Sequence, residues 1–195
     1  MDKEHVRESF LKYQSIRKIS YIDACVFIQS YLPSIGKQVV LKSISHSDII
    51  KTKVWKDKEG KPKAWNWADS YKRFKKLSNR LELAIYFGDH LCGLMYGKMS
   101  DAKDRTQRIC KINYIQAAHP NNPLKGLVLE ISEIYANTYA GLCGALGVAI
   151  QDPLPGAIEL YHNLGYTEND PFDPANSCLF KPETVDKIKQ KGNYQ

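Results

Sequence analysis

The stretch over residues 109–166 constrains the fold more than any other part of the chain. A strand-like run, Ile109–Ala118, is followed by a turn-rich loop and by an apolar helical run that ends near Gly144. A second short strand, Gly147–Gln151, leads through a Pro-rich turn into a helix that ends at Gly165. Strand, helix, strand and helix at these lengths predict a βαβ unit whose two strands are parallel and buried on both faces.

The remaining chain supplies elements on both sides of this unit. Apolar spacing predicts two N-terminal helices, Lys3–Lys18 and Ser20–Tyr31, which Pro33 and Gly36 bring to an end. Gly93 and Gly97 within a strand indicate close packing or a bulge. The other predicted elements are a strand Lys37–Ser45, a short helix from Ser47, an amphipathic helix Trp65–Leu77, a hairpin of Leu81–Phe87 and Leu91–Met99, and a last strand Ser177–Lys181.

Composition restricts the class of protein. The chain has 195 residues, of which 43% are hydrophobic, and this fits one ordinary globular domain with an appendage. No apolar run approaches the roughly 18 residues that a membrane span needs, and the N-terminus is too charged for a signal peptide. Five scattered cysteines without a CxxC pair indicate reduced thiols. We therefore expect a cytoplasmic protein without a metal site.

The net charge of +7 is concentrated in one segment, residues 51–80. This segment carries eleven Lys and Arg residues against three acids, and it also contains Trp55, Trp65 and Trp67. Basic residues interleaved with aromatic ones can bind a nucleic acid by phosphate contacts and stacking. They can equally bind coenzyme phosphates or an acidic substrate, or form a solvated helix face whose aromatic side chains anchor it to the core.

The helix at the end of the βαβ unit carries the clearest resemblance to a known family. Ala157, Tyr161, Gly165 and Tyr166 form the pattern A-x-x-x-Y-x-x-x-G-Y. This pattern resembles the GNAT-type N-acetyltransferase superfamily, in which such a helix closes the acetyl-coenzyme A site. The resemblance implies an α/β (α+β) fold with a mixed, mostly antiparallel sheet that is flanked by helices and splayed between its fourth and fifth strands. It implies a GNAT-like domain over residues 36–195, preceded by a helical extension over residues 1–35.

Acyl transfer from a thioester to an amine requires N–H donors for the coenzyme diphosphate, and a helix N-terminus supplies them best. The candidate here is the loop Asn121–Leu127. The superfamily usually carries Arg/Gln-x-x-Gly-x-Gly/Ala at this place, and this chain departs from it, because Val128 and Leu129 stand where a further glycine is expected. An ordinary turn before a capped helix is the alternative. The expected diphosphate contacts are Asn122, Lys125, Gly126 and Leu127.

The reaction also needs a fixed donor for the thioester oxygen and a proton donor for the departing thiolate. The resemblance implies that the Tyr161 hydroxyl lies near the coenzyme sulfur and donates this proton; a core tyrosine is the alternative. Asp152 stands where the family often carries Asn and is expected to contact the coenzyme; the alternative is that it caps a turn. The coenzyme is expected to lie along the fourth strand, at Ile115, Gln116 and Ala117.

The pattern singles out no general base. Glu82 alternates with two leucines and therefore points away from one core face; we take it as the catalytic candidate. A relayed water is equally consistent with the chain. The other possible general bases are Asn113, His119, Glu130 and Glu133.

The expected function is acetyl transfer from acetyl-coenzyme A to a primary amine of unknown class, by direct attack in a ternary complex. The alternative is a GNAT-fold module that has lost catalysis and binds nucleic acid or protein through residues 51–80.

Overall fold

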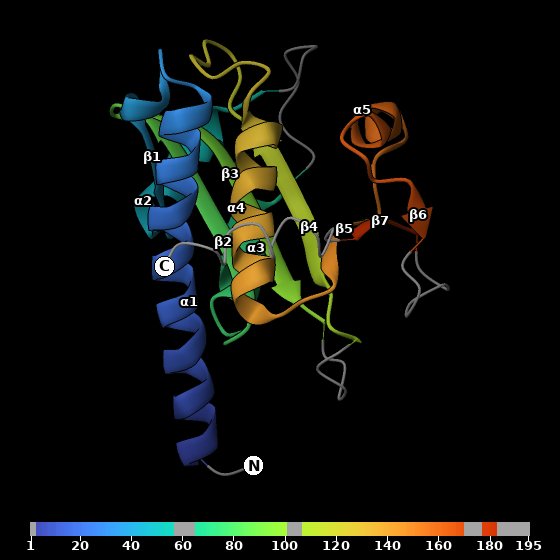
Figure 1. Cartoon of the computed structure of the whole chain (residues 1–195). Coiled ribbons are helices and arrows are strands. Elements are labelled where there is room, and N and C mark those ends of the chain that lie inside the picture. The colour runs from blue at the N-terminus through green and yellow to red at the C-terminus, as the bar shows by residue number, and fades with distance from the viewer. Residues whose placement is uncertain (1–2, 57–64, 101–106, 170–176, 183–195) are drawn as a thin grey trace, which may run out of the picture.

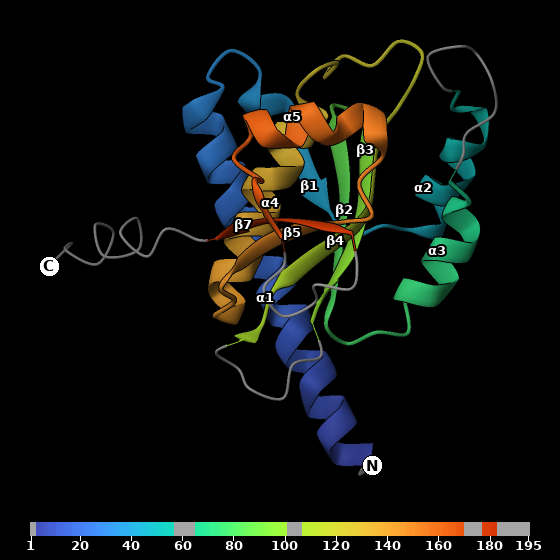
Figure 2. The same ribbon diagram turned by 90° about the vertical axis from the view of Figure 1, so that its right-hand side faces the viewer.

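The computed structural model describes residues 3–56, 65–100, 107–169 and 177–182. Within them a central sheet is covered by α1 and α4 on one face and by α2 and α3 on the other (Figures 1 and 2). In chain order the elements are α1 (Lys3–Tyr31), β1 (Val39–Lys42), α2 (His46–Lys51), α3 (Trp67–Phe74), β2 (Arg80–Phe87), β3 (His90–Met99), β4 (Cys110–Ala117), α4 (Val128–Cys143), β5 (Gly147–Gln151), α5 (Ile158–Asn163), β6 (Glu168–Asn169) and β7 (Cys178–Pro182).

The seven described strands form one sheet in the order β1-β2-β3-β4-β5-β7-β6. Every neighbouring pair is antiparallel except β4 and β5, which run parallel. The predicted α/β fold with a mixed, mostly antiparallel sheet is confirmed, and so is the predicted βαβ unit, β4-α4-β5. The predicted bounds of β5 are those of the structure.

Two hydrophobic clusters fill the two faces of the sheet. On the side of α1 and α4 the core contains Leu81, Leu83 and Ile85 of β2, and on the side of α2 and α3 it contains Ala84 and Tyr86 of the same strand. This alternation is what a strand buried on both faces requires. Because one cluster packs against each face of the same sheet, β4 is held in position from both sides.

The N-terminal region differs from the prediction, because α1 is one helix of 29 residues rather than two. Nothing between Lys18 and Ser20 interrupts a helix, and the Ser20 hydroxyl donates to the Ile16 carbonyl oxygen within the same helix. Ala24 and Ile28 of α1 belong to the same core as β2 and α4. The predicted extension is thus packed into the body of the domain on one side.

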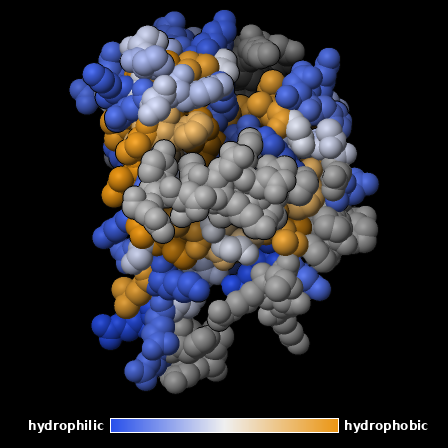
Figure 3. Space-filling view, viewed as in Figure 1, coloured by the Kyte–Doolittle hydropathy of each residue, from blue (hydrophilic) through white to orange (hydrophobic). Residues whose placement is uncertain are grey.

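The outer side of α1 is also partly apolar. Hydrophobic patches lie among hydrophilic ones over the region of α1 and α4 in the view of Figure 3. Among the exposed hydrophobic side chains of α1, Ile22 is 64% and Val26 59% exposed. Within the described residues, no helix is both long enough and apolar enough to cross a membrane. All five cysteines are free thiols.

Candidate active site

The two parallel strands of the βαβ unit separate soon after they pair. Cys110, Lys111 and Ile112 of β4 pair with Val148, Ala149 and Ile150 of β5, and the pairing ends there although β4 continues to Ala117. The sheet therefore forks toward the carboxyl ends of both strands, which is where open α/β sheets place their ligands. The predicted splay between the fourth and fifth strands is present.

A β-bulge in β4 accounts for the fork. Tyr96 of β3 pairs with Tyr114, but the next residue, Gly97, pairs with Ile112, so Asn113 is an extra residue on β4. A bulge bends its strand and increases the local twist, and here it does so where β4 leaves β5. A Cβ atom on Gly97 would lie 2.2 Å from the Lys111 carbonyl oxygen, so the close approach at the bulge requires glycine.

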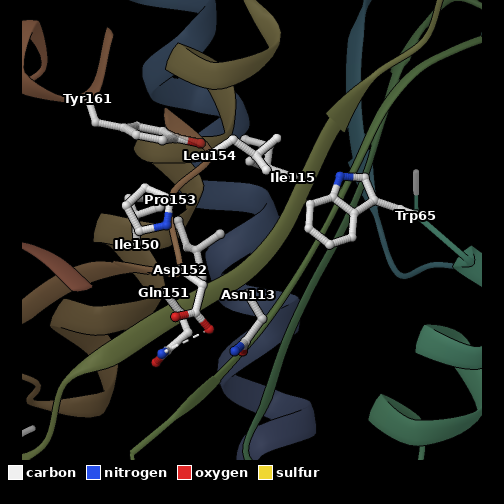
Figure 4. A pocket seen from close by; sticks show the side chains of 10 residues that line it. Trp65, Asn113, Ile115, Ile150, Gln151, Asp152, Pro153, Leu154 and Tyr161 are labelled. Atoms are coloured by element: carbon white, nitrogen blue, oxygen red, sulfur yellow. Dashed lines mark hydrogen bonds between the residues drawn. The ribbon is translucent and has the colours of Figure 1, made fainter. Parts of the chain in front are cut away.

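The fork holds a pocket of about 310 Å³, part of it open to solvent. Its lining comes from β4, β5, the loop after β5, α5 and the residue that precedes α3 by two positions (Figure 4). The lining residues are Trp65, Ile112, Asn113, Ile115, Ile150, Gln151, Asp152, Pro153, Leu154 and Tyr161.

Tyr161 projects from α5 into this pocket, with its hydroxyl directed toward Leu154 and Ile115 (Figure 4). The side chain is buried, and this burial raises the pKa of the hydroxyl. Its ring lies edge-on to that of Tyr166, with 6.2 Å between the ring centroids. The structure shows no hydrogen bond from this hydroxyl to any described residue. A protonated donor thus faces the space between the strands.

The other end of the pocket is polar. Asp152 follows β5 with a φ of 48°, and its backbone N–H donates to the Ser177 carbonyl oxygen at 2.8 Å. Its carboxylate accepts one long hydrogen bond, 3.3 Å, from Gln151 Nε2. Figure 4 shows the Asp152 carboxylate and the Asn113 amide at the same end of the pocket. The Asn113 Oδ1 atom is buried and has no hydrogen-bond partner within the described part of the chain.

The predicted coenzyme residues on β4 have different surroundings. Ile115 lines the pocket. The Gln116 side chain accepts a hydrogen bond from the Trp67 indole, on the α3 side of the sheet, and Ala117 is exposed where the strand ends. The pocket side of β4 nevertheless has no described strand partner beyond Ile112, so the strand edge there faces the fork.

The predicted diphosphate loop is held in place by Asn122. Its amide nitrogen donates to the carbonyl oxygens of Cys92 at 2.8 Å and Ala118 at 3.2 Å, and its Oδ1 accepts from the Leu124 N–H at 2.9 Å. The side chain of Asn122 is therefore engaged within the protein. Lys125 and Gly126 are exposed, and Gly126 has a φ of 87°.

Directly after this loop α4 begins without a side-chain cap at Leu127. The first bond of the helix runs from the Ile131 N–H to the Leu127 carbonyl oxygen, so the first-turn N–H groups before Ile131 have no helical acceptor. The start of α4 lies very close to β3, because a Cβ atom on Gly93 would be 2.5 Å from Val128 Cγ1. Gly93 thus lets the helix N-terminus approach the sheet.

The structure does not bring Glu82 to this pocket. Glu82 lies on β2, two strands away from β4, and its Oε1 accepts from Arg80 Nε at 2.9 Å and from the Ser43 hydroxyl at 2.7 Å. Arg17 Nε of α1 is 3.7 Å from the same oxygen. The residue is buried in an ionic cluster under α1.

Most of the described aromatic side chains of the basic segment, residues 51–80, lie in the protein interior. Trp55, Trp67 and Phe74 are buried in the core on the α2 and α3 side, and Trp65 lines the pocket. Residues 57–64 lie outside the described residues. Side chains in the core cannot stack on bases, so this placement does not support nucleic-acid binding. It agrees with the interpretation of a solvated helix face anchored by its aromatic residues.

Comparison with known proteins rests on structure alone. No protein-family model and no curated protein sequence matches the chain. A solved acetyltransferase from Thermus thermophilus is similar at a TM-score of 0.55 and 13% identity, over 75% of this chain and 97% of that chain. An aminoglycoside acetyltransferase from an uncultured soil metagenomic sample, in complex with sisomicin, is similar at a TM-score of 0.52 and 10% identity, over 70% and 93%. A transcriptional regulator from Bacillus halodurans C-125 is similar at a TM-score of 0.51 and 15% identity, over 67% and 94%.

The chain has the GNAT fold. The predicted resemblance is confirmed at this level, as a divergent example in which the glycine-rich loop is altered. In this GNAT-fold chain, the sequence missed two parts of the pocket. The sequence analysis treated Trp65 only as part of the basic segment, and it considered Asn113 only as one of several possible general bases. Gly97 was the available signal for the bulge at Asn113, since the glycine indicated a bulge without showing on which strand.

Proposed function

We propose that this chain is an acyl-coenzyme A-dependent N-acyltransferase that transfers an acetyl group to a primary amine. The observation that carries the proposal is the forked pair β4 and β5 with the Tyr161 hydroxyl directed into the opening. A pantetheine arm is narrow and carries amide groups, and it fits an opening walled by Ile115 and Leu154 along an unpaired strand edge.

The diphosphate would lie at the start of α4. The first-turn N–H groups without helical acceptors offer donors there, and a helix N-terminus favours an anion. Lys125 and Gly126, both exposed just before the helix, add a point charge and an accessible backbone. Asn122 contributes by shaping the loop, since its own side-chain groups are already bonded.

The transfer step uses the same geometry. The amine nitrogen attacks the carbonyl carbon of the thioester and a C–N bond forms; the C–S bond then breaks. The sulfur leaves as a thiolate and takes the proton of the Tyr161 hydroxyl, and the proton that the amine nitrogen gives up restores this hydroxyl by way of solvent. A hydroxyl with a raised pKa stays protonated until the thiolate appears, and this suits a general acid.

Titration calorimetry with acetyl-coenzyme A tests the proposal. Wild-type protein should bind it with micromolar affinity, and Ile115→Trp, which fills the fork, should weaken binding at least tenfold. Val54→Trp is the matched control, because Val54 is exposed and lies outside the pocket lining. Circular dichroism checks that both variants fold. Wild-type protein that binds no acetyl-coenzyme A would contradict the proposal and leave a GNAT-fold binding module.

A further inference from the structure

The polar end of the pocket offers acceptors that no described residue uses fully. Among the residues that the structure describes, none donates to the buried Asn113 Oδ1 atom, and the Asp152 carboxylate receives a single bond of 3.3 Å. Among the described residues no Lys, Arg or His forms an ion pair with Asp152. A buried acceptor without a donor is costly, so its persistence here points to a donor that arrives with the substrate.

The two acceptors face the same space from different strands. Asn113 is the bulged residue of β4, and Asp152 is the first residue after β5 (Figure 4). A carboxylate can only accept when it is ionised, so Asp152 cannot donate to the carbonyl oxygens of a pantetheine arm as an asparagine could. A primary ammonium has three donors and is compact enough to bind both oxygens. The chemistry of this end therefore fits the amine acceptor rather than the coenzyme.

The surroundings limit the charge of that acceptor. Asp152 is the one ionisable carboxylate among the ten residues that line the pocket. Beyond Trp65 the environment is basic, since the Arg73 guanidinium donates to the Tyr114 hydroxyl at 2.7 Å and Tyr114 contacts Trp65 at 4.8 Å between ring centroids. A second positive charge on the acceptor would find no second carboxylate among the residues that line the pocket.

We propose that the acceptor is a primary monoamine whose amine binds between Asp152 and Asn113 and whose remaining part is neutral or anionic. This inference rests on the proposed function and names the substrate class of the same site. It separates the chain from its structural neighbour in complex with sisomicin, an aminoglycoside with several amino groups. The bound ammonium gives one proton to solvent before its nitrogen attacks.

The test measures amine binding and coenzyme binding separately. Phenethylamine (neutral body), O-phosphoethanolamine (anionic body) and spermidine (polycation) are titrated by calorimetry and by tryptophan fluorescence, with and without coenzyme A. One of the two monoamines should bind at least fivefold more tightly than spermidine. D152N and N113L should each weaken that binding about tenfold and leave acetyl-coenzyme A affinity within twofold of wild type. D23N, an exposed site on α1, is the matched charge control and should change neither.

Each other outcome counts against the inference. Preference for spermidine, or no binding of any probe, overturns the monoamine class. A D152N variant that loses coenzyme affinity while it keeps amine binding would place Asp152 in the coenzyme site. Failure of the proposed function is a separate result, because wild-type protein would then bind no acetyl-coenzyme A whereas the amine titrations without coenzyme still report on Asp152 and Asn113.

Discussion

Two polar regions of this molecule contrast sharply, one buried under α1 and one at the pocket in the fork. Under α1, the Glu82 carboxylate is surrounded by Arg17, Arg80 and Ser43, which donate to or pair with its Oε1 atom. In the fork, Asp152 and Asn113 have almost no partners. Both regions contain a carboxylate on or next to a central strand, and sequence alone offered Glu82 as one candidate for the general base. The difference indicates that a carboxylate whose acceptor positions are used stabilises the fold, whereas one whose acceptor positions are largely unused is available to a substrate.

Removal of the Glu82 side chain is expected to have the largest effect on stability. In Glu82→Ala the guanidinium groups of Arg17 and Arg80 lose their counter-charge in a buried site, and breaking such a pair costs about 3–5 kcal/mol. Urea denaturation should show this loss as a lower midpoint. The matched control is Glu159→Ala on the exposed side of α5. A Glu82→Ala variant of full stability that binds acetyl-coenzyme A but does not turn over would instead make Glu82 the general base.

Tyr161→Phe probes the fork without disturbing its packing. The variant removes a hydroxyl that has no described partner, so stability and acetyl-coenzyme A affinity should stay close to wild type. If the hydroxyl protonates the thiolate, kcat should fall about 10²-fold, measured as thiol release with an amine that wild-type protein turns over. Burial raises the pKa of this group, so its deprotonation should lower the wild-type rate only above the ordinary tyrosine value of about 10. Unchanged kcat would rule out Tyr161 as the acid.

Local sequence chemistry predicted much of the fold. The hairpin of β2 and β3 and the strand β5 follow from alternation and turn residues, and the structure contains them within one residue of the predicted bounds. The division of α1 into two helices was wrong, because imperfect apolar spacing was read as a break. The apolar spacing of α1 is irregular for a different reason. Arg17 lies on the buried side of the helix and donates to the carbonyl oxygens of Ser78 and Arg80, at the start of β2.

The site was predictable only in part, since its remaining features arise from distant contacts. The position of Tyr161 in the pocket followed from the A-x-x-x-Y-x-x-x-G-Y pattern. The bulge at Asn113 depends on the register between β3 and β4, which no local pattern contains. Alternation separated Glu82 from the leucines of β2, but its partners include Arg17 of α1, which is remote in sequence.

A substitution at the close contact between α4 and the sheet should have a third, smaller effect, on stability and on acetyl-coenzyme A binding. In Gly93→Ala the new methyl group would lie 2.5 Å from Val128 Cγ1 and push the first turn of α4 outward. Overpacking of this kind costs about 1–3 kcal/mol, and it should also weaken acetyl-coenzyme A binding if the diphosphate lies at that helix start. The double variant Gly93→Ala with Val128→Ala removes the clashing carbon and should recover both. Loss of stability without loss of affinity would place the diphosphate elsewhere.

The smallest effect on stability is expected at Asp152, and it tests directly whether the two carboxylates differ in role. Asp152→Asn removes a carboxylate, as Glu82→Ala does, but Asp152 has no cationic partner among the described residues and its side chain is exposed to the pocket mouth. The left-handed backbone at Asp152 suits asparagine as well as aspartate, so the substitution introduces no strain. The free energy of unfolding should therefore change by less than about 0.5 kcal/mol, as for an ordinary surface substitution. A loss of several kcal/mol in urea denaturation would mean that the Asp152 carboxylate stabilises the fold as Glu82 does, and absent partners would then no longer distinguish a substrate site from a structural one.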